Sequence, residues 1–148
     1  MAGEEAMTGR RTRMRVLLVD GNETAREALR GVLATHEDVE LVGEARDGMA
    51  AVALTHQLKP DVVVVEPSLP DVAGASALRA ISMASPATRV LAVSSHRDKR
   101  YVARMLQSGA TGYLVKDFGF EELRDALCAV DQGDAYVSPT ISGVECAL

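Results

Sequence analysis

The sequence predicts an α/β protein with a doubly wound, five-stranded parallel sheet of (βα)5 topology and strand order 2-1-3-4-5. Five apolar segments alternate with five segments of helical periodicity, which is the pattern of repeated strand–helix units. The run Val62–Val65 contains no polar residue, so a strand formed by it needs cover on both faces. The connections between segments are short, which favours right-handed crossovers within a single sheet.

Turn and capping residues set the bounds of these elements along the chain. Asn22 or Thr24 can cap the first helix and Asp47 opens the second, since side-chain oxygens accept the free N–H groups of a first helical turn. Ser95 and Asp98 have the spacing of a capping box at the start of the fourth helix. The predicted strands are residues 15–20, 39–45, 61–66, 89–95 and 111–117, and the predicted helices are residues 21–36, 47–58, 75–85, 95–109 and 120–133.

The size and composition of the chain exclude several classes of protein. Its 148 residues, of which 47% are hydrophobic, are enough for one well-buried domain but too few for two. The net charge of −5 gives no overall attraction to nucleic acid. No apolar run approaches the roughly 18 residues of a membrane span, and no secretory signal follows the basic start. We therefore expect a cytoplasmic protein that makes no membrane contact.

The cysteines and histidines do not indicate a metal site. Cys128 and Cys146 have neither the spacing of metal ligands nor the density of a disulfide scaffold, so we expect reduced thiols. His36, His56 and His96 fall in different predicted elements. We expect these three histidines to lie at the surface.

Four polar side chains lie at the ends of predicted strands. Asp20 ends the first strand and Glu66 the third, while Ser94 and Lys116 lie at the ends of the fourth and fifth. In a doubly wound sheet, ligands bind at the carboxyl ends of the strands, where the strand order reverses. Charged groups at such a place need partners. We therefore expect these four side chains to share one functional crevice.

Three segments together carry a resemblance to a known family. They are KPDVVVVEPSLPDVAG (residues 59–74), SSHRDKRYVARMLQSGATGYLVKD (residues 94–117) and AYVSP (residues 135–139). They are similar to response-regulator receiver domains, which have a flavodoxin-like fold. More narrowly, they resemble the DNA-binding response regulators whose output is a small four-helix helix-turn-helix domain.

The resemblance divides the chain into three regions. Residues 1–14 are polar and aperiodic, and we expect a disordered N-terminal arm. Residues 15–135 are the expected receiver domain. Residues 136–148 are expected to be a C-terminal tail, or the start of a linker to an output domain that is absent from this chain.

The resemblance also implies a chemical role for each residue of the crevice. In this family an aspartate on the third strand takes a phosphoryl group from a histidine kinase, with help from Mg²⁺ held by two adjacent acids. A hydroxyl, an aromatic switch and a lysine respond to the phosphoryl group. The matching positions here are Glu66 for the phosphoacceptor, Asp20 and Gly21 for the acidic pair, Ser94 for the hydroxyl, Tyr113 for the aromatic switch and Lys116 for the lysine.

Two of these positions depart from the family pattern. Gly21 removes a carboxylate that Mg²⁺ would need, so we expect weak or absent Mg²⁺ binding, with Asp20 and Glu66 as vestigial ligands. The side chain of Glu66 is one methylene longer than aspartate, which moves its carboxylate by about 1.5 Å and impairs nucleophilic attack. We therefore predict that Glu66 is not phosphorylated and instead contacts Lys116.

The resemblance leaves the mode of action open. The leading hypothesis is an atypical receiver domain, not an enzyme, that acts as a homodimer or through a histidine kinase or another regulatory protein. Dimers in this family use either helix 1 with helix 5 or the face of helix 4, strand 5 and helix 5. DNA would be contacted only through the missing output domain.

Two alternatives remain beside this hypothesis. The first is a receiver converted to a sensor of a small molecule or protein ligand, which the altered crevice permits. The second is a phosphatase-like enzyme, because LLVDGNET faintly resembles the nucleophile motif of haloacid-dehalogenase-like phosphatases. In that motif Asn22 replaces the second acid, and an amide cannot transfer a proton as a carboxylate does.

Overall fold

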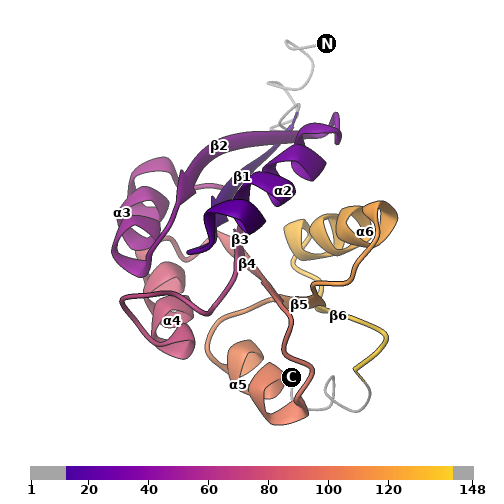
Figure 1. Ribbon diagram of the computed structural model, residues 1–148. Coiled ribbons are helices and arrows are strands. Elements are labelled where there is room, and N and C mark those ends of the chain that lie inside the picture. Colours follow the sequence, from indigo (N-terminus) through magenta and orange to yellow (C-terminus); the bar gives the residue numbers. More distant parts are fainter. Residues whose placement is uncertain (1–12, 142–148) are drawn as a thin grey trace.

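The computed structural model describes residues 13–141, which form one parallel sheet covered by helices on both faces (Figure 1). Most of the expected arm and part of the expected tail lie outside the described residues. Cys146 also lies outside them. In order, the elements are β1 (Met14–Val19), α2 (Glu23–Ala34), β2 (Val39–Ala45), α3 (Gly48–Leu58), β3 (Val62–Val65), α4 (Gly74–Ala84), β4 (Arg89–Ser94), α5 (Lys99–Gln107), β5 (Gly112–Val115), α6 (Phe120–Asp131) and β6 (Tyr136–Val137).

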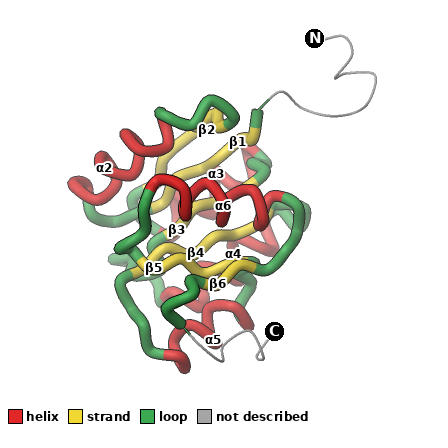
Figure 2. Tube along the Cα trace, turned by 90° about the vertical axis from the view of Figure 1, so that its right-hand side faces the viewer, coloured by secondary structure: helices red, strands yellow, loops and turns green. Residues whose placement is uncertain are grey.

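The strand order is β2-β1-β3-β4-β5-β6, with every neighbouring pair parallel. The predicted order 2-1-3-4-5 is therefore confirmed, and β6 extends the sheet by one short strand at the β5 edge. Figures 1 and 2 show α2 and α6 on one face of the sheet and α3, α4 and α5 on the other. Within residues 13–141, no helix is both long and apolar enough to cross a membrane.

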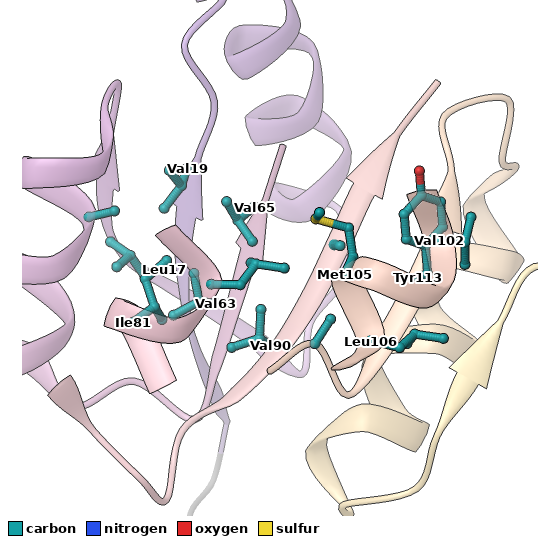
Figure 3. Packing of buried hydrophobic residues seen from close by; sticks show 14 of the residues in the cluster. Leu17, Val19, Val63, Val65, Ile81, Val90, Val102, Met105, Leu106 and Tyr113 are labelled. Atoms are coloured by element: carbon teal, nitrogen blue, oxygen red, sulfur yellow. The ribbon is translucent and has the colours of Figure 1, made fainter. Parts of the chain in front are cut away.

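The predicted burial of the third strand on both faces is confirmed. All four residues of β3 are fully buried, and their side chains alternate between two clusters. Val63 and Val65 pack toward α4 and α5, as Figure 3 shows, while Val62 and Val64 pack toward α2 and α6. A continuous apolar run is what a strand between two helical layers requires.

Helix caps agree with two of the three predictions. Asn22 caps α2 and Asp47 caps α3, each accepting a hydrogen bond from a backbone N–H three residues on. The predicted capping box of Ser95 and Asp98 is wrong. Asp98 is itself the N-cap, accepting from Arg100 N, so α5 begins four residues after Ser95. Ser95 and Asp98 have the spacing of a capping box, but residues 95–97 lie in the loop before α5, so Ser95 is too far from the helix to cap it.

Residue 136 begins a strand that the sequence analysis did not predict. Tyr136 and Val137 pair with Gly112 and Tyr113 of β5, although both had been placed in the tail or linker. Two residues are too short a run for periodicity to identify a strand. Without β6, the main-chain N–H and C=O groups at the edge of β5 would have no strand partner, so the pairing is favourable.

Gly112 is the glycine whose lack of a side chain matters most for this edge. A Cβ at Gly112 would lie 2.8 Å from Val130 Cγ2 and 3.0 Å from the carbonyl oxygen of Tyr136. At Gly31, on the exposed side of α2, a Cβ would meet no atom within 4 Å. The two glycines are therefore a matched pair for substitution by alanine.

Gly112→Ala is expected to lower the free energy of unfolding by about 1–3 kcal/mol, because α6 and β6 must both move away. Gly31→Ala is expected to raise it by up to about 1 kcal/mol, because alanine favours the helix. Urea denaturation of both variants measures the difference. Equal effects of the two substitutions would contradict the close packing at Gly112.

Candidate functional site

Parallel strands bring the four predicted side chains to one edge of the sheet. Asp20 follows β1, Glu66 follows β3, Ser94 ends β4 and Lys116 follows β5. Asp20, Glu66 and Ser94 are buried, with 2%, 9% and 0% of their surface exposed, while Lys116 is partly exposed. The structure therefore brings the four side chains to the same edge of the sheet, where the two carboxylates lie largely out of water.

Glu66 and Lys116 form the central contact of the site. Lys116 Nζ lies 2.9 Å from Glu66 Oε1 and 3.6 Å from Asp20 Oδ2. Burial disfavours the charge of Lys116, but the hydrogen bond and negative charge of Glu66, with a further contribution from Asp20, outweigh it and raise the pKa of Lys116. The predicted pairing of Glu66 with Lys116 is present.

The other carboxylate oxygens of the site also have partners. Asp20 Oδ1 accepts a hydrogen bond of 2.8 Å from Asn22 N, and Glu66 Oε2 accepts one of 3.1 Å from Ser68 N. Octahedral Mg²⁺ requires several oxygens free to coordinate it. Among the described residues, no group of three His, Cys, Asp or Glu side chains is placed to hold a metal ion. Both carboxylates of the site are therefore already engaged, by Lys116 and by backbone N–H groups.

Gly21 lies against the loop that follows β3. A Cβ at this position would lie 3.1 Å from Pro70 Cδ and 3.4 Å from the carbonyl oxygen of Arg46. The space beside the missing carboxylate is therefore bordered by Pro70. An aspartate at position 21 would require this loop to shift by a few tenths of an ångström.

The loop after Glu66 is tied to α3. Asp71 accepts hydrogen bonds from the backbone N–H groups of Gly48 (2.7 Å) and Met49 (3.0 Å), and these bonds lower the pKa of its carboxyl group. A carboxylate at a helix N-terminus is also favoured by the helix dipole. This contact joins the loop after Glu66 to the start of α3, and the sequence analysis did not predict it because the two segments are distant in the sequence.

The predicted switch residues lie on the side of the site facing α5. Tyr113 is fully buried, and its hydroxyl donates a hydrogen bond of 2.8 Å to the carbonyl oxygen of His96. Figure 3 shows its ring beside Val102 of α5. Burial raises the pKa of Tyr113 to about 12. Ser94 Oγ accepts a hydrogen bond of 3.2 Å from His96 N, so the same loop residue contacts both predicted switch residues.

Tyr101 is a site residue that the sequence analysis did not identify. Burial and the negative charge of Glu66 raise the pKa of Tyr101. The hydroxyls of Ser68 and Ser94 oppose this shift but do not cancel it. Its ring stacks on His96 at 4.3 Å and meets Tyr113 edge-on at 6.3 Å. Tyr101 therefore connects the first turn of α5 to the crevice.

A second ring contact corrects the expectation for His36. It is buried, with 3% of its surface exposed, and stacks on Phe120 at 4.2 Å. The contact joins the end of α2 to the start of α6. Its position at the end of a helical pattern gave no signal of burial, because the partner ring is over eighty residues away in the sequence.

Comparison with known proteins identifies relatives of the chain. Residues 16–128 match the response regulator receiver domain family. The chain is 33% identical over 130 residues to the transcriptional regulatory protein DegU of Brevibacillus brevis, covering 88% of this chain and 55% of that protein. It is 33% identical over 129 residues to the response regulator GacA of Pseudomonas aeruginosa, covering 87% and 60%. The chain thus spans little more than half the length of these curated relatives.

Solved structures agree with this assignment. The signal receiver domain of the putative response regulator NarL from Mycobacterium tuberculosis is 33% identical, with a TM-score of 0.78 over 83% of this chain and 99% of that chain. A two-component response regulator of the LuxR family from Aurantimonas sp. SI85-9A1 is 31% identical, with a TM-score of 0.82 over 88% and 93%.

Glu66→Gln is expected to lower the pKa of Lys116 and to reduce the free energy of unfolding by about 1–2 kcal/mol at neutral pH. The folded pKa of Lys116 is raised, so the stabilisation is present below its ordinary value of 10.5 and is lost as the pH rises through the higher folded value. NMR titration of Lys116 and denaturation at several alkaline pH values measure both effects. Glu121→Gln, on the exposed start of α6, is the control, and an unchanged Lys116 pKa in Glu66→Gln would contradict the pairing.

Proposed function

Because this chain belongs to the response regulator receiver domain family, we propose that it is an atypical receiver domain of a transcriptional regulator. In this proposal the domain is not phosphorylated at the usual position. It transmits regulation through contacts with a second copy or with a partner protein. The relatives are named as regulators rather than enzymes, which supports a regulatory role over a phosphatase activity.

The contact between Glu66 and Lys116 carries the proposal. Glu66 Oε1 lies 2.9 Å from Lys116 Nζ, so the carboxylate already binds the lysine that would otherwise pair with a phosphoryl group. Its second oxygen is bound to Ser68 N, which leaves the carboxylate poorly placed for attack on phosphorus. The imitation of a phosphorylated site is partial, since a carboxylate carries about one negative charge and a phosphoryl group about 1.5 to 2.

Phosphorylation can be tested by repairing the two altered positions. The natural chain, incubated with Mg²⁺ and acetyl phosphate, is expected to gain no phosphoryl group in intact-mass measurements. The double variant Gly21→Asp, Glu66→Asp is expected to bind Mg²⁺ and to gain one, because it restores both the second acid and the shorter nucleophile. Glu66→Asp alone is the matched control, and uptake of phosphate at Glu66 in the natural chain would contradict the proposal.

Homodimerisation through the face formed by α2 and α6 is the second part of the proposal. These are the first and fifth helices of the chain, which correspond to helix 1 and helix 5 of the family. Phe120 on this face is 48% exposed. Two neighbouring cavities, of about 190 and 360 Å³, share Ala28, Val32 and Phe118 in their walls. This is a largely apolar, hollowed surface, of the kind that protein contacts cover.

The other face used for dimers in the family (helix 4, strand 5 and helix 5) corresponds here to α5, β5 and α6. There the chain's own residues pack between β5 and α5, with Val137 and Ile141 joining the cluster that contains Val102 and Leu106. An element of the same chain therefore already covers part of that face. This supports the choice of the α2–α6 face for a second copy.

Ala28→Glu is expected to weaken self-association at least about tenfold, because a charge would be buried in the α2–α6 contact. Sedimentation equilibrium over a range of concentrations measures the dissociation constant. Met83→Glu, at a site on α4 that is 81% exposed, is the matched control and is expected to leave association unchanged. A natural chain that remains monomeric at high concentration would contradict this part of the proposal.

The ligand-sensor hypothesis has weaker support. The cavity beside Asp20 and Lys116 is lined mainly by apolar side chains of α2, with Val93 and Phe118, and has a volume of about 190 Å³. Sites for drug-sized molecules are usually about 300–1,000 Å³. A ligand there would have to be small, and the cavity lies on the face proposed for dimerisation.

In the proposed function a histidine kinase is a further partner of the domain. The domain itself is not proposed to contact DNA.

A further inference from the structure

The segment after α6 is bound along the whole of β5, the strand that leads to Lys116. Tyr136 N donates to Thr111 O at 3.4 Å, and Ser138 N donates to Tyr113 O at 3.0 Å. Ser138 Oγ then accepts from Val115 N at 2.8 Å. These three bonds occur at alternate residues, from the one before β5 to its last residue, so the segment is held in register with β5 up to the residue before Lys116.

Ser138 continues the strand pairing with its side chain. Its surface is 2% exposed, and its hydroxyl takes the bond that a backbone carbonyl would make if β6 were longer. Val115 is also buried, so removal of the hydroxyl would leave its N–H without a partner out of water. This cost ties the position of Ser138 to that of Val115.

The segment also contacts the helices on both faces of the sheet. Tyr136 lies on the α6 side, where its hydroxyl donates to Glu122 Oε2 at 3.1 Å. Ile141, whose N–H donates to Ser138 O at 2.9 Å, is 5% exposed and belongs to the cluster with Val102 of α5. The segment therefore touches the strand of Tyr113 and the helix of Tyr101 at once.

We propose that residues 136–141 are the output element of this domain, and that Ser138 is the positioning residue that couples it to the switch strand. A hydrogen bond tolerates only a few tenths of an ångström of displacement before it weakens. A shift of β5 at Tyr113 or Val115 must therefore move the segment with it or break its bonds. A displacement of this segment is passed along the chain, because residues 142–148 follow it directly in the sequence. The inference rests on the proposed function, because the signal arises at the Glu66–Lys116 contact.

Hydrogen exchange of the backbone amides tests the coupling. Glu66→Gln frees Lys116 and is expected to speed exchange at Tyr136 and Ser138 by about fivefold or more, since the end of β5 loses its anchor. In the Ser138→Ala background the same change is expected to alter exchange at Tyr136 by less than about twofold. Ser85→Ala removes a buried hydroxyl elsewhere in the chain, and its background is expected to keep the full response.

Ser138→Thr retains a hydroxyl and is expected to restore the response that Ser138→Ala loses. A loss of basal protection alone would show only that Ser138 stabilises the edge, so the deciding quantity is the response to Glu66→Gln. An equal response in the natural and Ser138→Ala backgrounds would overturn the inference. So would the absence of any response in the natural background when compared with Glu121→Gln. The latter comparison remains available if Ser138→Ala does not fold.

This experiment is independent of the test for phosphorylation. Uptake of phosphate by Glu66 would contradict the proposed function but would leave the exchange coupling intact. Additive exchange effects would contradict the coupling and leave the proposed function standing.

Discussion

The parallel alignment of the strands is the constraint on which the site depends. Because every strand runs in the same direction, the carboxyl ends of β1, β3, β4 and β5 meet at one edge. Asp20 and Lys116, nearly a hundred residues apart in the sequence, thus lie within 3.6 Å of each other. The apolar runs that precede these residues are buried between two helical layers, which places each polar residue at the point where the core ends.

Once the charges are gathered, each requires a partner, and the site is closed by these partners. Lys116 binds Glu66, Asp20 binds Asn22 N, and the second oxygen of Glu66 binds Ser68 N. Buried charges without partners would be costly, so these contacts stabilise the site. In the proposed function, Glu66 supplies the group that binds Lys116, and Gly21 leaves position 21 without a second carboxylate.

The pocket is linked outward by two routes. The first starts at Glu66, whose charge acts on Tyr101. The Tyr101 ring contacts the rings of His96 and Tyr113, and the Tyr113 hydroxyl donates a hydrogen bond to the carbonyl oxygen of His96. The second runs from Lys116 along β5 to Ser138 and the segment after α6. Both routes meet at Tyr113, because its hydroxyl contacts the α5 side and its carbonyl oxygen binds Ser138. Tyr113 is therefore the residue through which the α5 side of the site and the segment after α6 are joined.

The sequence by itself determined the fold class, the strand order and the set of side chains at the crevice. Repeated strand–helix patterns encode burial, and burial on both faces of Val62–Val65 leaves a parallel sheet as the solution. The pairing of Glu66 with Lys116 followed from that topology, since opposite charges at one edge attract.

Only the tertiary structure decided the contacts whose partners are distant and whose local pattern is neutral. Tyr101 and Asp71 meet the site from other elements, and His36 is buried only because Phe120 covers it. Tyr136 and Ser138 lie in a run too short for periodicity, and they bind β5 because its edge has free main-chain groups. Periodicity records how much of each element is buried, whereas these contacts depend on which donors and surfaces remain once the elements have packed.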